Sequence, residues 1–316
     1  MQVAVESWSP EYGAPADDGA LAASSGDVDL DVERSPSEWR PLTPPAGVAL
    51  PSVIGFVDGV RRVDARVWVT GADGQPRQGI CATWAAGVVR CDASAKVSSI
   101  AAIEVRRGLF TPVRDATALR TRFADYPLVS VADDEPDQLS LALQGSMAEL
   151  EHRVSDRAAS DDGPADLLVV DGPLRQRQRL VGAVGYVKTH HAAYLPESVR
   201  PVVAALGRGQ RTPVFQIGGR FSRWSWYLRL PCSIDHGWSG VVRCEASPEL
   251  PVADAVARAD QVASTLPRFA SAPQKDPRAP QNLYPIAGLE RALSRRLGDP
   301  LLLFRSLREA AFRAAA

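Results

Sequence analysis

Hydrophobic and polar residues begin to alternate regularly near Leu50, and their pattern predicts a series of β-strands. The short apolar run PSVIGFVDG has the length of a buried strand and closes at Asp58 with Asp-Gly, a dipeptide typical of turns. Three further strand-like runs follow closely: RRVDARVWVTG, GICATWAAGVVRCD and KVSSIAAIEVRRGLF. Because connections this short suit antiparallel neighbours, we predict a meander that opens with the strand ending at Asp58.

Helical spacing replaces this alternation over residues 138–159. Apolar side chains recur there at steps of three and four, as on one face of an amphipathic helix: Leu143, Met147, Leu150, Val154 and Ala158. The next apolar run, DLLVVDGPL, predicts a second buried strand that again closes with Asp-Gly, at Asp171.

The rest of the chain mixes strands and helices. The predicted strands are VGAVGYVKTH, TPVFQIGG, WSWYLRLP and GVVRCEA, and the predicted helices are ESVRPVVAALGRG, VADAVARADQVASTL, YPIAGLERALSRRLG and DPLLLFRSLREAAFRAA. We therefore expect an α/β fold with one core over residues 49–316. Residues 1–48 are rich in Ala, Ser, Asp, Gly and Pro, which predicts a disordered or loosely docked extension with Trp39 as its anchor.

The charges of the chain nearly cancel, with 36 Lys and Arg against 37 Asp and Glu. No overall positive field can gather nucleic acid, so any such contact requires a local patch. Residues 208–229 interleave arginines with aromatic residues, as single-strand grooves do. Because Trp224 and Trp226 alternate onto one strand face, we expect the tryptophans to be mostly core and some of the arginines to face DNA.

Cysteine spacing and hydropathy restrict the class of protein further. The pairs Cys81/Cys91 and Cys232/Cys244 are ten and twelve positions apart, unlike zinc ribbons, so reduced and buried thiols are expected. No long apolar run precedes Arg34, the first basic residue, which indicates neither a secretory signal nor a membrane span. We expect a cytoplasmic protein.

The two strands that close with Asp-Gly are expected to bring Asp58 and Asp171 side by side at one edge of a sheet. Buried like charges are unfavourable unless a cation joins them, and oxygen ligands suit Mg²⁺ or Mn²⁺. Glu151 borders the apolar stripe of the preceding helix and is a candidate third ligand, although a solvated glutamate is the alternative. An Asp-Gly pair is also often only a turn.

Three other sets of polar residues lie near these strands. Lys188 could neutralise a scissile phosphate or pair with Glu151 or Asp171 for structural reasons, and both interpretations stay open. For His190 and His191, a surface or hydrogen-bonding role is favoured over acid–base catalysis. Arg243 and Glu245 share a strand face, where they would support a metal site or form an edge pair.

Six sequence blocks, in order, resemble those of NurA-domain nucleases: FVDG, LLVVDGPL, VGYVKTH, WYLRLP, GVVRCE and NLYPIAGLERAL. The resemblance runs from about Leu50 to Gly298. It implies a ribonuclease H-like mixed sheet flanked by helices and a homodimer. It also implies a manganese-dependent nuclease, with Mg²⁺ as the alternative ion, that degrades DNA from 5′ ends, cuts single strands and works with a HerA-type hexameric ring ATPase in DNA end processing.

By position, the resemblance assigns metal-binding and catalytic roles to Asp58, Glu151, Asp171 and Glu290, with Lys188 as a further catalytic residue. Glu290 departs from the usual histidine or aspartate, which leaves Asp276 or Asn282 as a shifted ligand. Two ions roughly 3.5–4 Å apart would activate water and stabilise the leaving 3′ oxygen.

Two other functions remain open at the level of sequence. One is a catalytically inactive relative that docks a ring ATPase, for which the change at Glu290 is the main support. The other is a ribonuclease H-like enzyme acting on RNA or hybrid duplexes, since carboxylates do not distinguish the sugars.

Overall fold

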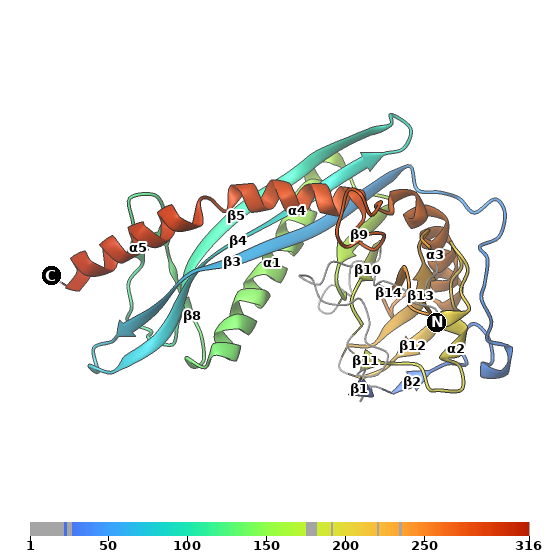
Figure 1. The fold of residues 1–316 in the computed structure, drawn as a ribbon, viewed down its shortest axis with the longest axis horizontal. Helices are drawn as coiled ribbons and strands as arrows, with labels where there is room; N and C mark the ends of the chain where they lie inside the picture. Colours follow the sequence, from blue (N-terminus) through green and yellow to red (C-terminus); the bar gives the residue numbers. More distant parts are fainter. Residues whose placement is uncertain are drawn as a thin grey trace, which may run out of the picture. The chain divides into compact units, whose positions relative to one another are not determined.

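The structure is mixed α/β, with a large mixed sheet flanked by helices (Figure 1). It is a computed structural model that describes residues 22–23, 27–174, 182–190, 192–219, 221–233 and 236–315. One core was expected over residues 49–316, whereas contacts divide the chain into two compact units. Unit 1 comprises Met1–Phe56, Arg90–Ser99 and Ala165–Ala287, and unit 2 comprises Val57–Val89, Ile100–Pro164 and Gly288–Ala316.

The sheet of unit 2 contains the long strands of the predicted meander. β3 (Val53–Thr70), β4 (Pro76–Asp92) and β5 (Val97–Thr111) are successive neighbours in the sheet, and all three also contribute residues to unit 1. The short β8 (Leu128–Ser130) pairs in parallel with the end of β5. Only five residues separate β3 from β4 and four separate β4 from β5, so these neighbours run antiparallel.

Asp58 does not end a strand, contrary to the prediction. β3 continues through Asp58 and Gly59 to Thr70, so the Asp-Gly pair lies inside one strand of 18 residues. The hydrogen bonds of a sheet satisfy the backbone here and outweigh the turn preference of the dipeptide. The sequence block RRVDARVWVTG is therefore the second half of β3 and not a separate strand.

Three helices belong wholly or partly to unit 2. α1 (Pro136–Asp162) extends the helix predicted over residues 138–159, and it buries the predicted residues Leu143, Leu150, Val154 and Ala158. α4 (Tyr284–Arg296) contributes its residues from Gly288 onward, and α5 (Pro300–Ala315) follows it. A hairpin of β6 (Leu119–Arg120) and β7 (Asp125–Tyr126) packs against α5.

The sheet of unit 1 has the strand order β2-β12-β13-β14-β10-β9, followed by the first residues of β3. β9 and β10 are parallel, and the other neighbouring pairs from β10 to β2 are antiparallel. Their bounds are β2 Val28–Asp29, β9 Leu167–Asp171, β10 Ala183–Val187, β12 Phe215–Ile217, β13 Arg223–Arg229 and β14 Val241–Ala246. A separate two-stranded sheet pairs β1 (Ala22–Ala23) with β11 (Ala192–Ala193).

Helix α3 (Val252–Thr265) packs on β13 and β14 and continues into a short 3-10 helix, η4 (Leu266–Phe269). The helix predicted from ESVRPVVAALGRG is much shorter than expected, since α2 spans only Pro201–Ala204. Pro201 lacks the backbone N–H that would continue a helix from the preceding residues, so these residues form turns and the helix starts at Pro201, although Arg200 before it has helical dihedrals.

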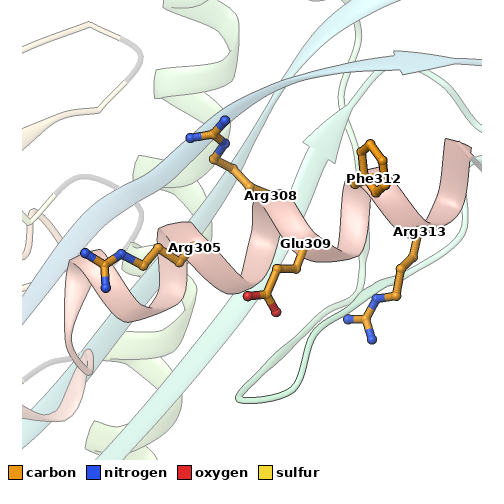
Figure 2. A pocket seen from close by; sticks show the side chains of 5 residues that line it. All are labelled: Arg305, Arg308, Glu309, Phe312 and Arg313. Carbon is orange, nitrogen blue, oxygen red and sulfur yellow. The ribbon is translucent and has the colours of Figure 1, made fainter.

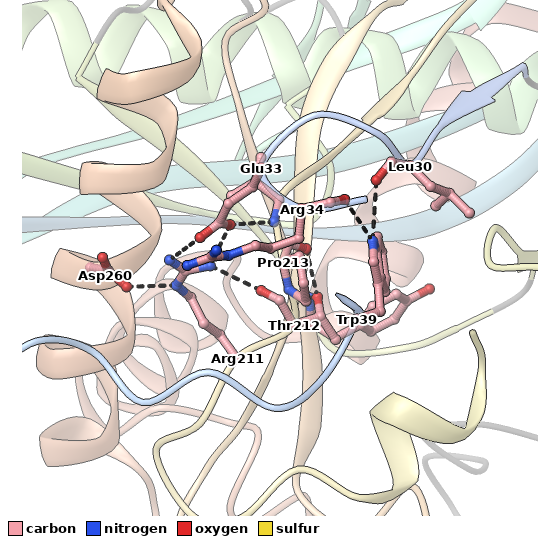
Figure 3. Close-up of polar contacts among 10 residues, drawn as sticks. Leu30, Glu33, Arg34, Trp39, Arg211, Thr212, Pro213 and Asp260 are labelled. Atoms are coloured by element: carbon pink, nitrogen blue, oxygen red, sulfur yellow. Dashed lines mark hydrogen bonds and ion pairs between the residues drawn. The ribbon is translucent and has the colours of Figure 1, made fainter. Parts of the chain in front are cut away.

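Residues 27–48 belong to unit 1 and are held against the rest of this unit by a buried ion-pair network. Arg211 is 2% exposed and donates to Glu33 at 2.8 and 2.9 Å and to Asp260 at 2.7 Å (Figure 3). Trp39, the expected anchor of this segment, lies beside the short 3-10 helix η2 (Pro36–Glu38) and packs against Phe215 with ring centroids 5.9 Å apart. The side chains of Glu33 and Trp39 therefore hold residues 27–48 in place, although the composition of this segment is poor in core residues. Residues 1–21 and 24–26 of the predicted extension lie outside the described residues.

In the part of the chain that the structure describes, no helix combines the length and the apolar character required to cross a membrane.

Candidate functional site

Asp171 lies where the sequence places it, at the end of β9. Val169 and Val170 before it are buried, and Gly172 after it turns the chain with φ at 91°, a conformation that glycine adopts without strain. Asp171 is registered opposite Tyr186 on the parallel strand β10. Residues in register point to the same side of a sheet, as do residues two apart. Asp171, Tyr186 and Lys188, which follows β10, therefore share one face.

Lys188 joins Asp171 to an amide and a second carboxylate. Its Nζ donates to Asp171 Oδ2 at 2.7 Å and to Asn282 Oδ1 at 3.2 Å. The Nδ2 of Asn282 in turn donates to Asp276 Oδ2 at 2.9 Å. These four residues, which we call the Asp171 group, all belong to unit 1. Of the two roles left open for Lys188, pairing with Asp171 is therefore present in the structure.

One oxygen of this group makes no hydrogen bond. Among the described residues, Asp171 Oδ1 is buried and has no donor within reach, although the other oxygen of the same carboxylate accepts from Lys188. A buried carboxylate oxygen without a donor is unfavourable by roughly 1–3 kcal/mol. The position is one that a cation could satisfy.

Hydrogen bonds hold the loop that carries Asp276 and Asn282. The Arg278 N–H donates to Asp276 Oδ1 at 2.8 Å, and the Asn282 N–H donates to the Arg278 carbonyl at 3.0 Å. Tyr186 donates its hydroxyl to the Gln281 carbonyl at 2.6 Å, and burial raises the pKa of this phenol well above its usual value. The loop is thus tied directly to β10, the strand beside Asp171.

Arg243 and Glu245 lie on the opposite face of the sheet from Lys188. Glu245 is registered opposite Gly185, which alternates with Tyr186, and its carboxylate binds Arg223 and Arg243, each at 2.8 Å. Its other oxygen accepts from the Leu174 N–H at 3.0 Å. Glu245 therefore fixes the loop that follows Asp171 from the far side of the sheet, whereas the sequence left support of a metal site and a simple edge pair as alternatives.

Asp58 and Glu151 form a second acidic group, in unit 2. Each is 6% exposed, and Asp58 Oδ1 accepts from the Gly59 N–H at 2.8 Å. A Cβ added to Gly59 would lie 2.5 Å from Glu151 Oε1, so the carboxylate of Glu151 packs against the backbone next to Asp58. We call these two residues the Asp58 group. The helical spacing placed Glu151 at the border of the buried stripe, with a solvated glutamate as the alternative, and the structure shows the side chain buried.

Glu290, the expected last ligand, is half-buried on α4 in unit 2. The two residues considered as its substitutes, Asp276 and Asn282, are those that the structure brings together with Asp171. Across the described residues, no set of three or more His, Cys, Asp or Glu side chains is arranged to hold a metal ion.

The arginines predicted to face DNA between residues 208 and 229 are mostly engaged within unit 1. Arg229 is fully buried and donates to the carbonyls of Ser239, Gly237, Val203 and Ala204. Arg211 and Arg223 bind carboxylates, as described above, and Arg208 donates to the Cys232 carbonyl at 2.8 Å. Arg220 lies outside the described residues. Some arginines of this segment were expected to face DNA, and the structure shows that Arg211, Arg223 and Arg229 are instead engaged within unit 1.

The tryptophans of this segment are core residues, as expected. Trp224 is 7% exposed and Trp226 is fully buried. His190 is also buried, with its ring 5.7 Å from Tyr227 and 5.0 Å from Trp238, and its Nε2 lies 3.3 Å from the Val241 carbonyl. Its hydrogen bond fits the role favoured from sequence, while His191 lies outside the described residues.

At the level of sequence, Asp276 and Asn282 were considered only as alternatives to Glu290. The one available signal was their place shortly before the predicted helix YPIAGLERALSRRLG. The structure adds what spacing could not, namely the contact with Lys188. Comparison of the sequence with protein-family models and with curated proteins finds no match to either.

Proposed function

We propose that this protein is a metal-dependent DNA nuclease of the NurA type. The observation that carries the proposal is Asp171: a strand-ending carboxylate with one oxygen held by Lys188 and the other buried without a donor among the described residues. A hard oxygen of this kind is a ligand suited to Mn²⁺ or Mg²⁺. The buried carboxylates of Asp58 and Glu151 add two further oxygen-bearing side chains of the same chemical class.

The proposal assigns metal binding to Asp171 in unit 1 and to Asp58, Glu151 and Glu290 in unit 2. Asn282 and Asp276 are the alternatives to Glu290, because they belong to the Asp171 group, where Asn282 accepts from Lys188 and donates to Asp276. A bound divalent cation would lower the pKa of a water and stabilise the charge of the departing oxygen. Lys188 holds Asp171 in place and carries a positive charge that suits a phosphate.

Element order supports a ribonuclease H-like fold as part of the proposal. The chain runs through a three-stranded meander (β3, β4 and β5), a long helix (α1) and two parallel strands (β9 and β10). The strand order is β3-β4-β5 in unit 2 and β10-β9-β3 in unit 1. In this arrangement, carboxylates come from the first strand, the helix and the strand that follows the helix.

The wider assignment follows the resemblance of the sequence blocks. It comprises 5′-to-3′ digestion of DNA, cutting of single strands, a homodimer, and joint action with a HerA-type hexameric ATPase in DNA end processing. A catalytically inactive adaptor for such an ATPase is the second candidate, and the Lys188–Asp171 ion pair favours it, because this pair neutralises the carboxylate without a metal.

Nuclease assays with matched variants test the proposal. Purified protein with Mn²⁺ is expected to degrade labelled single-stranded and double-stranded DNA. Asp58→Asn, Asp171→Asn and Glu151→Gln are expected to lose at least about 100-fold in rate, since even residues that only orient a metal ligand are worth about 10- to 100-fold. Glu149→Gln, on the exposed side of α1 two residues from Glu151, is the control and should keep full activity.

Two other outcomes decide between the alternatives. Absence of cleavage together with tight binding of a ring ATPase would favour the adaptor. Preferential cleavage of RNA or of a hybrid duplex would favour a ribonuclease H-like enzyme with a different substrate. Equal cleavage by the wild type and the three acidic variants would remove all of these residues from the reaction.

A further inference from the structure

Helix α5 buries one face in unit 2 and leaves the other face open. Leu303, Ser306, Leu307 and Ala310 are buried, and Leu307 packs in the core cluster that includes Cys81. The opposite side carries large apolar residues in solvent: Phe312 is 80% exposed, Leu301 66% and Phe304 42%. An isolated exposed apolar residue needs no explanation, but several on one helix face point to a binding surface.

Arginines alternate with these apolar residues. Figure 2 shows Arg305, Arg308, Phe312 and Arg313 along α5, together with a single acidic residue, Glu309. The guanidinium of Arg308 lies 6.0 Å from the ring centroid of Phe304. Within the described residues, no hydrogen bond or ion pair engages the guanidinium of Arg305 or Arg313. These cations are therefore available for an external anion.

A second pair of the same kind lies on the neighbouring hairpin of unit 2. Arg122 stacks over Phe123 at 5.5 Å, and Phe123 is 49% exposed at the turn between β6 and β7. The hairpin packs against α5 through β6. Exposed phenylalanines accompanied by arginines therefore recur on adjacent elements of one unit.

This combination is the opposite of the one in residues 208–229. There, Arg211 and Arg229 are buried together with Trp224, Trp226 and Tyr227, and Arg211 binds Glu33 and Asp260. On α5 the same residue types face solvent. Arginine matches phosphate geometry with two parallel hydrogen bonds, and bases stack on exposed aromatic rings.

We propose that this face of α5 binds single-stranded DNA. The α5 face is defined by six residues: Leu301, Phe304, Arg305, Arg308, Phe312 and Arg313. Phe312 stacks on a base, and the arginines pair with phosphates. Phe304 and Phe312 are eight residues apart, about 12 Å along the helix, with Arg305 and Arg308 between them. The choice of DNA over other single strands rests on the proposed function, and no residue of the α5 face belongs to either acidic group.

Charge argues against a second copy of this chain as the occupant. A two-fold contact would place the same surface against itself, so arginines would face arginines with a single glutamate per copy to offset them. A single nucleic-acid strand complements both features, since its phosphates pair with the arginines and its bases stack on the exposed phenylalanines.

Fluorescence anisotropy with labelled oligothymidine, in EDTA so that no metal-dependent cleavage occurs, tests the proposal. Loss of one stacked base is expected to weaken binding by about 5- to 150-fold in Phe312→Ala. Leu141→Ala is the matched control, since Leu141 is an apolar residue on α1 of the same unit and is 56% exposed. Unchanged affinity in Phe312→Ala would overturn the proposal.

The salt dependence of the binding constant separates ionic contacts with phosphates from nonspecific apolar adsorption. Loss of one phosphate contact should reduce the slope of log K against log salt by about 0.7 in Arg308→Ala, while Arg308→Lys keeps most of it. Arg157→Ala, at an exposed arginine of α1, should leave the slope unchanged. Equal slopes for Arg308→Ala and Arg157→Ala would contradict phosphate pairing.

Two further measurements, the oligomeric state of the variants and their cleavage of DNA, complete the test of the α5 face. Conversion of a dimer to a monomer by Phe312→Ala would show that a second copy covers the face and would overturn the proposal. Because binding is measured without metal, failure of the nuclease proposal leaves this test intact. Conversely, wild-type cleavage with unchanged anisotropy in the α5 variants would reject only the α5 face.

Discussion

The two acidic groups of this protein contain the same kind of residue but differ in what lies next to their carboxylates. In the Asp171 group, Lys188 lies 2.7 Å from Asp171, and Asn282 connects that lysine to Asp276. In the Asp58 group, two carboxylates that are each 6% exposed lie beside one glycine. In the first group a lysine forms an ion pair with Asp171, whereas in the second the carboxylate of Glu151 packs against the backbone next to Asp58. The two groups should therefore respond differently to the same substitution of an acid by its amide.

The largest expected difference is in the stability of the metal-free protein. Asp171→Asn leaves the ammonium of Lys188, whose side chain is 9% exposed, without its carboxylate. Breaking one partner of a buried pair is unfavourable by about 3–5 kcal/mol, so a loss near 3 kcal/mol is expected at this partly exposed site. Glu151→Gln removes one of two neighbouring negative charges and should lower stability less. Urea unfolding in EDTA measures the free energy of unfolding of both variants. An equal loss of stability in Asp171→Asn and Glu151→Gln would contradict the expected difference between the two acidic groups.

Alanine variants of Gly185 and Gly59 test the same difference between the two acidic groups, with an expected loss of stability of intermediate size. A Cβ at Gly185 would lie 2.9 Å from the Leu174 N and 3.0 Å from the Gly172 carbonyl oxygen, both backbone atoms of the loop after Asp171. Since backbone cannot rotate away, Gly185→Ala should lose about 1–3 kcal/mol. At Gly59 the closest atom is the end of the Glu151 side chain, so Gly59→Ala should lose less stability and instead displace that carboxylate.

Gly145→Ala is the control for both glycines. Gly145 lies in α1 with open space around its Cβ position, and alanine there should stabilise the helix by about 0.5–1 kcal/mol. Thermal unfolding of the three variants gives the ranking. A stable Gly185→Ala protein would mean that the loop after Asp171 is not held against β10.

The smallest effects concern the cysteine thiols of the two units. Burial, with a further contribution from the charge of Asp64, raises the pKa of Cys81 in unit 2 to about 12, and burial raises the pKa of Cys244 in unit 1. Cys232 is half-buried. A thiolate-specific reagent near neutral pH is expected to label Cys232 first and the others only when their unit opens. Simultaneous labelling of Cys81 and Cys232 in the native protein would contradict this order.

The raised pKa of Cys81 also sets a direction for stability against pH. Its folded value of about 12 exceeds the ordinary value of 9.0, so the unfolded chain loses this proton first. The contribution of the protonated thiol is present below about pH 9 and declines as pH rises toward 12. Cys81→Ala should flatten that decline, as measured by urea unfolding across the range.

Apolar runs and apolar spacing predicted most of the elements, because strands and helices bury apolar residues. The strand ending at Asp171 followed from such a run, and the helical spacing placed Glu151 at the border of the buried stripe of its helix. The end of the strand at Asp58 was mispredicted, because pairing within a long sheet overrides the local turn preference of Asp-Gly. The start of α2 at Pro201 reflects the missing N–H of proline, a local rule that was available in the sequence but was not applied.

Contacts between distant segments were beyond the reach of the sequence. Pairing of Lys188 with Asp171 was one of the alternatives left open, but nothing in the spacing indicated that Asn282 would accept from the same lysine. Composition also misplaced the exposed arginines, because residues 208–229 and α5 have similar mixtures of arginine and aromatic residues. Exposure depends on whether acids such as Glu33 and Glu245 meet the arginines, which the linear sequence does not show.

Calorimetric titration with Mn²⁺, in the absence of DNA, tests the central claim most directly. If Asp58 and Asp171 are metal ligands, then Asp58→Asn and Asp171→Asn should each weaken binding by at least about tenfold, while Glu149→Gln leaves it unchanged. Wild-type affinity in both aspartate variants would contradict the proposed metal-dependent function.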